Sequence, residues 1–299
     1  MLLPVTFIQV TQVERLTPRM ARVTFEAETL DETVGRLPDQ QVKLCFPREG
    51  QAEPVLPARS EDPMGWYRAC LAVPEAERPW LRSFTVRRRR PGTRLLEIDF
   101  VLHGDSGPAS GPDSGPDGGP AAAWARRARP GDRLGMVGPS ELYARPVPLA
   151  TAVAEADWVL LAGDETALPA IGTLLEALPP GTGAVAFIEV AEEAERQRLD
   201  SRADLTVHWL HRDGAAPGGP LTAAVRAADL PGGTPFAWLA GEAAAVRALR
   251  RHLVEERGLA RPSVEFAGYW RHRLTQDDAP TEEDLADARE KLAQAARDQ

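Results

Sequence analysis

A chain of 299 residues with 43% hydrophobic residues is long enough and apolar enough to build two domains with cores of ordinary size. Its net charge of −9 argues against a nucleic-acid-binding protein or one that coats acidic membranes, because both need a basic surface. The two cysteines, Cys45 and Cys70, have neither metal nor redox spacing, so we expect no metal site and a reducing, cytoplasmic compartment. No apolar run reaches the ~20 residues of a membrane span, so we expect no integral membrane association.

The first half of the chain, up to residue 148, is predicted to form an antiparallel β-barrel. Its segments carry β-branched and aromatic residues between turns rich in Pro and Gly, as strands do. The expected strands are residues 4–16, 20–28, 39–47, 82–89, 94–103 and 131–139. One helical segment, residues 121–129, lies between the last two.

A repeat of four residues, GPASGPDSGPDGGPAA, interrupts this half at residues 107–122. Proline fixes φ and lacks an N–H, and glycine loosens the chain, so repeated Gly-Pro continues neither a strand ladder nor a helix. We therefore expect a loop, whose expansion costs little closure entropy.

The second half alternates short apolar strands with helices, beginning after a Pro-containing linker at residues 143–153. This rhythm predicts βαβ units on a parallel sheet, and hence a Rossmann-like domain. The last residues, 281–299, place Leu285, Ala288 and Leu292 at helical spacing, and Thr281 followed by Asp284 is typical of a capping box. A C-terminal helix is predicted there.

A barrel followed by a nucleotide-type α/β domain resembles the flavin reductases of the ferredoxin-NADP reductase type. The segment RSFTVR, residues 82–87, fits a flavin contact, because an arginine can pair with a pyrophosphate and an aromatic two residues on shares its strand face. As a lone pattern, the same segment is equally an ordinary barrel strand.

The order of several motifs narrows this resemblance. RSFTVR is followed by IDFVLHGDSGPAS, by AAWARRARPGDRLGMVGPS, and then by LLAGDETALPAI, FIEV, WLAGEAAAVRALRRHL and FAGYWR. This series resembles the siderophore-interacting protein family of flavin-dependent ferric-siderophore reductases, from about residue 5 to residue 275. The motifs GDETALP and GYWR are not generic features of Rossmann domains.

The resemblance implies that FAD binds in the barrel. Phe84 would keep the stacking face of the usual family tyrosine while losing its hydroxyl. Asp99, Val101 and His103 are further candidates, because alternate residues of one strand share a face. The implied FAD residues are Arg82, Phe84, Thr85, Arg87, Asp99, Val101 and His103.

The family also has a turn before a helix whose N-terminus faces the flavin pyrophosphate, where free N–H groups favour an anion. Two copies of that turn compete here, at Gly107–Ala109 and at residues 119–125. We expect the second copy to start the helix. Its implied contacts are Gly119, Pro120, Ala121, Ala122 and Trp124.

In the α/β domain the first β-to-α turn, GDETALP, presents carboxylates where a phosphate-binding turn offers glycines, so residue chemistry alone predicts helix caps. The resemblance places the turn beside the nicotinamide cofactor instead. Glu189 ends the next strand, where an acid can bind a ribose diol, which leans towards NADH over NADPH. The implied residues are Gly163, Asp164, Glu165, Thr166, Ala167, Glu189, Gly241 and Glu242.

A ferric siderophore is often anionic and needs a local basic patch. Lys43 stands where the family commonly has a siderophore-binding lysine, and Arg271 and Arg273 follow the last strand. The alternative is one solvated lysine and two loop arginines.

The expected protein is thus an FAD enzyme that passes electrons from NAD(P)H, or from a ferredoxin, to chelated Fe(III). The cofactor carries the chemistry, so no side chain is expected to act as acid, base or nucleophile. The expected domains are residues 1–148 for FAD, 149–275 for NAD(P)H and 276–299 as a helical extension. The alternatives are a general NAD(P)H-dependent flavin or ferredoxin-type reductase and a non-catalytic siderophore-binding protein.

Overall fold

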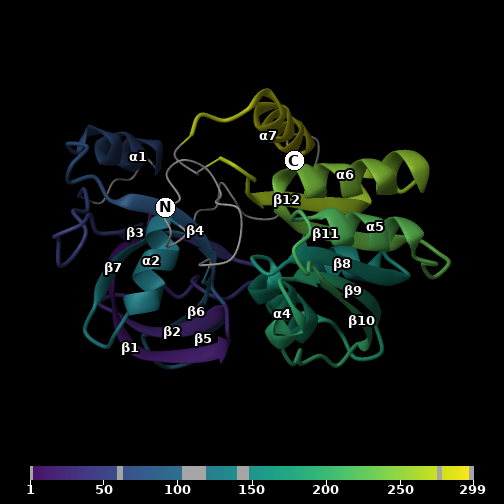
Figure 1. The fold of residues 1–299 in the computed structure, drawn as a ribbon, viewed down its shortest axis with the longest axis horizontal. Helices are drawn as coiled ribbons and strands as arrows, with labels where there is room; N and C mark the ends of the chain where they lie inside the picture. The colour runs from purple at the N-terminus through teal and green to yellow at the C-terminus, as the bar shows by residue number, and fades with distance from the viewer. Residues whose placement is uncertain (1–2, 59–62, 103–118, 140–147, 275–277, 296–299) are drawn as a thin grey trace. The chain divides into compact units, whose positions relative to one another are not determined.

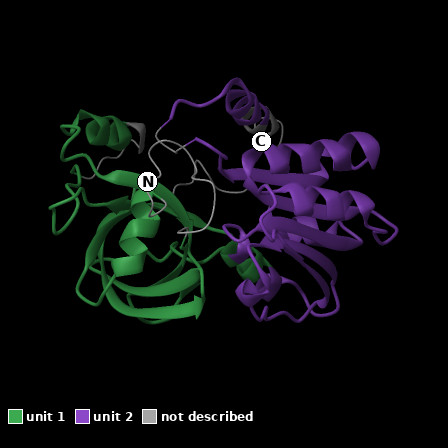
Figure 2. Ribbon diagram, viewed as in Figure 1, with its two compact units in different colours: residues 1–109, 114–144, 169–174 green, residues 110–113, 145–168, 175–299 purple. Residues whose placement is uncertain are grey.

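The computed structural model describes residues 3–58, 63–102, 119–139, 148–274 and 278–295. The chain divides into two compact units, which Figure 2 shows in different colours. The first comprises residues 1–109, 114–144 and 169–174, and the second comprises residues 110–113, 145–168 and 175–299.

The first unit is a curled antiparallel sheet of seven strands with the order β4-β3-β7-β1-β2-β6-β5 (Figure 1). The first strand of this order, β4, contacts the next-to-last strand, β6, through side chains, since the ring centroids of Phe84 and Phe100 are 4.6 Å apart. The strands are β1 (Val5–Thr17), β2 (Met20–Ala27), β3 (Gln41–Phe46), β4 (Trp80–Thr85), β5 (Arg88–Arg89), β6 (Leu95–Val101) and β7 (Arg133–Val137). The predicted barrel is confirmed.

Helix α2 (Gly119–Arg127) completes the core of this unit. Its Trp124 is 4% exposed and stacks on Phe25 at 6.1 Å between ring centroids. Helix α1 (Pro63–Ala72) was not expected from the sequence. Among its side chains from residue 65 on, Trp66 and Cys70, one turn apart, are buried, while Tyr67 and Leu71 are exposed, so its apolar pattern is too short to stand out.

The second unit is a parallel sheet of five strands with the order β10-β9-β8-β11-β12. Its strands are β8 (Trp158–Asp164), β9 (Gly183–Val190), β10 (Asp204–His211), β11 (Pro235–Glu242) and β12 (Val264–Trp270). Its helices are α3 (Leu149–Ala154), α5 (Gly219–Ala227), α6 (Ala243–Arg251), which continues as the π-helix η3 (His252–Glu256), and α7 (Glu282–Ala295), with short 3-10 turns η2 (Glu193–Glu195) and η4 (Arg261–Ser263). Helix α4 (Leu168–Ala177) connects β8 to β9, and its residues 169–174 are grouped with the first unit. The predicted Rossmann-like domain is confirmed.

The strand order fixes where ligands can gather on this sheet. The chain moves outward from β8 to β9 and β10 and then returns to β11, so right-handed crossovers place α4 on one face and α5 on the other (Figure 1). The direction of the chain reverses next to β8, and ligands of open α/β sheets bind outside the carboxyl ends of the strands at such a point. The residues that end β8, β9, β10 and β11 therefore define the edge to examine.

The C-terminal helix α7 begins with the predicted capping box. Thr281 N donates to Asp284 Oδ2 at 2.9 Å, and Asp284 N donates to Thr281 Oγ1 at 3.2 Å. Charges hold the helix to its unit, because Asp284 and Asp287 pair with Arg247 at 3.3 and 3.2 Å, whereas Leu285 is 42% exposed. The helix is thus held by its acidic side chains and not by the apolar side chains whose spacing predicted it.

A buried ion pair crosses the outer face of the barrel. Arg22 in β2 stands opposite Asp99 in β6, and its Nε and Nη2 donate to the two carboxylate oxygens at 2.7 and 2.8 Å. The Asp99 side chain is 2% exposed. Removing one partner of such a pair leaves the other charge buried and uncompensated.

We predict that Asp99→Ala lowers the free energy of unfolding by about 2–4 kcal/mol in urea titrations. The matched control is Glu26→Ala, which breaks an exposed pair with Arg94 and should cost about 1 kcal/mol or less. Unchanged stability together with lost flavin would instead make Asp99 a cofactor contact.

Candidate functional site

Strand β4 carries the predicted flavin segment. Arg82 and Phe84 stand opposite Leu44 and Val42 of β3, both buried in the barrel core, so the two side chains share a face as expected. Phe84 is only partly buried, and it packs on Phe100 at 4.6 Å between ring centroids. The partly exposed ring of Phe84 thus lies on the same strand face as the guanidinium of Arg82.

Cations gather around this strand. The guanidinium carbon of Arg48 lies 3.7 Å from the centroid of the Trp80 ring, and that of Arg82 lies 5.6 Å from it. Arg82 Nη1 donates to the Leu81 carbonyl at 2.9 Å. Sequence reasoning missed Arg48 and Trp80, because Arg48 comes just after a different strand and its contact with β4 depends on the pairing of β3 with β4.

Lys43 adds a third cation to this strand pair, on the opposite face from Arg82, because it is paired with Ser83. Its Nζ donates to Ser83 Oγ at 3.1 Å across the β3–β4 pair. Burial lowers the pKa of this amine, and the positive charge of Arg82 acts in the same direction. Among the described residues no carboxylate neutralises it. Lys43, Arg48 and Arg82 are called the basic cluster below.

The lysine is unusual within this chain. Lys43 and Lys291 are its only two lysines, whereas arginine supplies every other side-chain cation except histidine. An ammonium is a compact point charge, whereas arginine binds anions through a planar fork. A half-buried ammonium without an acidic partner, among arginines, is the chemistry expected of a site for an anion.

The other predicted flavin residues have varied surroundings. Thr85 is buried, and Arg87 lies with its guanidinium against Gly172, where an added Cβ would be 3.2 Å from Nε. Val101 is partly exposed at the end of β6. Asp99 is committed to Arg22, which gives it a structural role that the face-sharing argument could not foresee. His103 lies outside the described residues.

Helix α2 begins at Gly119, so the second copy of the Gly-Pro turn starts the helix, as expected. Gly119 has φ of +70°, a conformation that glycine adopts without strain, and Pro120 and Ala121 follow it in the first turn. Ala122 and Trp124 are buried in the barrel core, where they anchor the helix. The first copy, Gly107–Ala109, and the repeat up to residue 118 lie outside the described residues.

The GDETALP turn is organised around the carboxylate of Asp164. This side chain is 2% exposed and accepts from Thr166 N at 2.9 Å and from Thr166 Oγ1 at 2.5 Å. It also accepts from Glu242 N and from Trp270 Nε1, both at 2.8 Å. One carboxylate therefore joins the ends of β8, β11 and β12.

This arrangement requires a glycine at position 241. Gly241 has φ of +136°, and a Cβ there would lie 2.6 Å from Asp164 Oδ2. Burial raises the pKa of Asp164 to about 6, and the neighbouring Glu165 carboxylate acts in the same direction. Gly163 and Ala167 flank the turn and are buried.

Glu165 and Glu189 share one arginine. Both oxygens of Glu165 accept from Arg212, whose Nη1 also donates to Glu189 Oε1 at 3.2 Å. Glu189 is wholly buried and accepts from Gly218 N at 2.8 Å and Leu221 N at 2.9 Å, so it caps α5. The expected ribose contact of Glu189 is therefore not available, and the lean towards NADH loses its basis.

The last predicted acid, Glu242, is also internal. It caps α6 by accepting from Ala245 N at 2.9 Å, and its second oxygen accepts from His272 N at 3.1 Å. Glu189 and Glu242 thus cap helices. Asp164 and Glu165, for which residue chemistry alone predicted caps, bind Thr166, strand ends and Arg212 instead of the N–H groups of α4. The donors bound to these carboxylates partly offset their negative charge, so each would repel a bound phosphate less than a free carboxylate would.

The two arginines after β12 differ from each other. Arg271 donates to Asp284 Oδ2 at 3.0 Å and to the carbonyls of Ala279 and Asp278, so it holds the C-terminal segment. The expected substrate contact of Arg271 stays a prediction. Arg273 is exposed and has φ of +65°.

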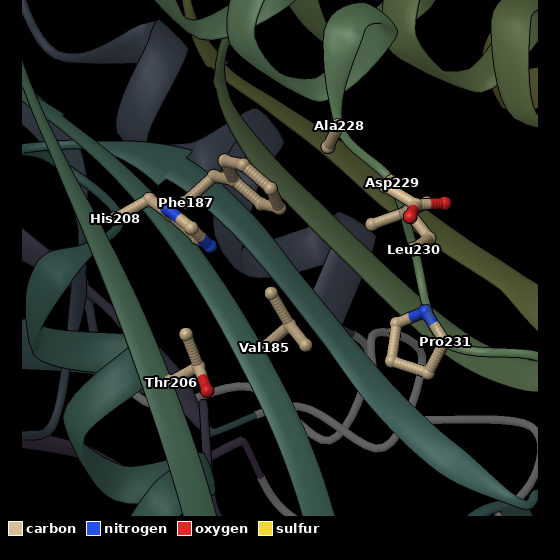
Figure 3. Close-up of a pocket in the computed structure, with 8 residues that line it drawn as sticks. All are labelled: Val185, Phe187, Thr206, His208, Ala228, Asp229, Leu230 and Pro231. Carbon is tan, nitrogen blue, oxygen red and sulfur yellow. The ribbon is translucent and has the colours of Figure 1, made fainter.

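A separate hollow of about 250 Å³ lies between β9, β10 and the loop after α5 (Figure 3). His208 stacks on Phe187 at 4.5 Å between ring centroids, with Asp229 on the opposite wall. Its lining contains neither lysine nor arginine. The hollow therefore does not fit a phosphate or an anionic iron chelate, in contrast to the basic cluster.

Comparison with known proteins assigns the family. Residues 9–143 match the siderophore-interacting FAD-binding domain, and residues 156–273 match the siderophore-interacting protein domain. The chain therefore belongs to the siderophore-interacting protein family. No helix among the described residues is long and apolar enough to cross a membrane.

Named relatives extend over almost the whole chain. A ferric vibriobactin reductase of Vibrio cholerae is 31% identical over 89% of this chain and 94% of its own length. An NADPH-dependent ferric-chelate reductase of Escherichia coli is 28% identical over 88% and 91%. The crystal structure of a siderophore utilization protein from T. fusca matches with a TM-score of 0.73 and 37% identity, over 92% of this chain and 96% of that one.

The Asp164 carboxylate generates a pH prediction. Its pKa in the folded protein is about 6, above the ordinary value of 3.8, so the folded protein binds more protons between these values. The contribution of Asp164 to stability should therefore rise as the pH falls from about 7.5 to 5, by up to about 1.4 kcal/mol per pH unit within that window.

The variant Asp164→Asn does not titrate, so urea unfolding at several pH values should show wild type gaining stability relative to the variant towards pH 5. The substitution also replaces one acceptor oxygen by a donor, so the variant should be less stable at all these pH values. A constant difference between the two proteins from pH 5 to 7.5 would show that Asp164 keeps an ordinary pKa.

Proposed function

We propose that this protein is an FAD-dependent ferric-siderophore reductase of the cytoplasm. The observation that carries the proposal is the basic cluster of Lys43, Arg48 and Arg82 in the unit that matches the FAD-binding domain. In a chain of net charge −9, these cations gather where one lysine has no acidic partner among the described residues. The names of the relatives, ferric vibriobactin reductase and ferric-chelate reductase, support the same activity.

The residues of the first unit fit FAD. Arg82 supplies a guanidinium for the pyrophosphate, and the stack of Arg48 on Trp80 stands beside it. Phe84 offers a half-open aromatic ring, and Thr85 and Arg87 follow on the same segment. The first turn of α2 adds backbone N–H groups that favour an anion.

Bound FAD would supply the electron transfer, accepting two electrons from a donor and passing them one at a time to Fe(III). The side chains of this chain bind and orient. Lys43 attracts the anionic iron chelate, and Arg82 holds the pyrophosphate by charge-assisted hydrogen bonds. Hard oxygen chelators bind Fe(II) less tightly than Fe(III), so reduction releases the iron.

The electron donor proposed first is a nicotinamide dinucleotide, with a ferredoxin as the alternative. The turn of Gly163–Ala167 stands at the carboxyl edge of β8 before α4, where a pyrophosphate binds in dinucleotide-binding sheets. The buried carboxylates hold this edge rather than contact the cofactor. Arg273, exposed after β12, stays a candidate for the substrate.

The activity is tested by two half-reactions on the purified full chain. The absorption spectrum should show bound flavin, anaerobic NADPH or NADH should bleach it, and added ferric siderophore should restore it. A protein that stays colourless with added FAD would be a binding protein. Reoxidation by simple ferric salts as fast as by ferric siderophores would make it a general reductase.

Lys43 gives a sharper test of the substrate site. Lys43→Ala should raise the KM for an anionic ferric siderophore about ten- to hundredfold, because a charge-assisted contact is worth about 1.5–3 kcal/mol. Anaerobic reduction of the flavin by NAD(P)H should not change. Lys43→Arg keeps the charge and should recover much of the affinity. Equal damage to both half-reactions would make Lys43 a structural residue.

A further inference from the structure

Glu189, near the carboxyl end of β9, is not placed to select NADH. In dinucleotide-binding sheets, an acidic side chain at the end of the second strand accepts from the ribose hydroxyls. Glu189 stands at this point, but it is wholly buried and accepts from Gly218 N, Leu221 N and Arg212 Nη1. Turning it towards a ribose would leave those buried donors unsatisfied, at a cost that a diol contact does not offset.

A different pair of side chains stands at this edge of the sheet. Arg196 follows the turn η2 in the connection from β9 to β10, and His211 is the last residue of β10, opposite Val190 of β9. Arg196 Nε donates to His211 Nε2 at 3.0 Å. The guanidinium always carries the Nε proton, so the neutral imidazole accepts through Nε2 and keeps its own proton on Nδ1.

This bond orients Arg196 without using up its donors. The guanidinium has five N–H groups, and the bond to His211 takes one of them. Glu193 Oε1 lies 3.7 Å from Arg196 Nη1, and the two side chains are 79% and 43% exposed, so their attraction is weak. The remaining N–H groups and the His211 Nδ1 proton together form a donor set that suits a phosphate monoester.

The other cations of this edge are engaged. Arg212 is bound to the buried carboxylates of Glu165 and Glu189, and Arg198 pairs with Asp200 at 3.1 Å. The sheet order β10-β9-β8 puts Arg196 and His211 two strand spacings, about 10 Å, from the GDETALP turn. A dinucleotide with its pyrophosphate at that turn extends its adenosine half over β9, towards this pair.

We infer that Arg196 and His211 bind the 2′-phosphate of NADPH and make the protein select NADPH over NADH. The inference rests on the proposed function, in which a nicotinamide dinucleotide reduces the flavin. It names the group that distinguishes the two donors, a dianionic phosphate monoester on the adenosine ribose.

The test is calorimetric binding of adenosine 2′,5′-bisphosphate and of 5′-AMP to the purified full chain. These probes differ only in the 2′-phosphate, and they need neither the nicotinamide nor electron transfer. Wild type should bind the bisphosphate at least tenfold more tightly than 5′-AMP. Arg196→Gln should remove most of this difference while leaving the dissociation constant of 5′-AMP within twofold.

The matched control is Arg198→Gln, which removes an exposed charge two residues away and should leave both dissociation constants within twofold of wild type. His211→Asn should weaken only the bisphosphate. Equal binding of both probes by wild type, or equal losses in the Arg196 and Arg198 variants, would overturn the inference while leaving a dinucleotide donor in place. Binding of neither probe would overturn the inference and, with it, the proposed dinucleotide donor.

Discussion

The carboxyl edge of the parallel sheet depends on one buried carboxylate. Asp164 accepts four hydrogen bonds, from Thr166 twice, from Glu242 N and from Trp270 Nε1, and so joins three strand ends in one cluster. Such a group is stable when buried only while its donors stay in place. The positive φ of Gly241 is part of the same constraint, because any side chain there would meet this carboxylate.

Several other acids at this edge are also used for structure. Glu165, Glu189 and Glu242 face inward, to an arginine or to the N-termini of helices. Two cations keep spare hydrogen-bonding capacity, Lys43 in the barrel and Arg196 at the same sheet edge after β9. The ligands proposed for both places are anions, a ferric chelate and a phosphate, which the net charge of −9 would otherwise disfavour.

The sequence was enough to predict features that depend on local pattern. Strand alternation predicted the barrel, and Thr281 with Asp284 predicted the cap of α7. It was not enough where a contact joins distant segments. Glu189 lies at the sequence position where a ribose contact is expected. Its hydrogen bond from Leu221 N depends on the tertiary fold, which brings the start of α5 to the end of β9. Arg48 was missed for the same reason, because its contact with Trp80 crosses from β3 to β4.

The variant Glu189→Gln tests most directly whether the buried acids at the sheet edge serve the fold and not the cofactor. Calorimetric titration with 5′-AMP, an adenosine ribose with both hydroxyls free, should give a dissociation constant within twofold of wild type. Urea unfolding of the same variant should show a loss of about 1–3 kcal/mol, because the caps of α5 and the pairing with Arg212 are weakened. A tenfold weaker binding of 5′-AMP at unchanged stability would contradict the account and return Glu189 to the ribose.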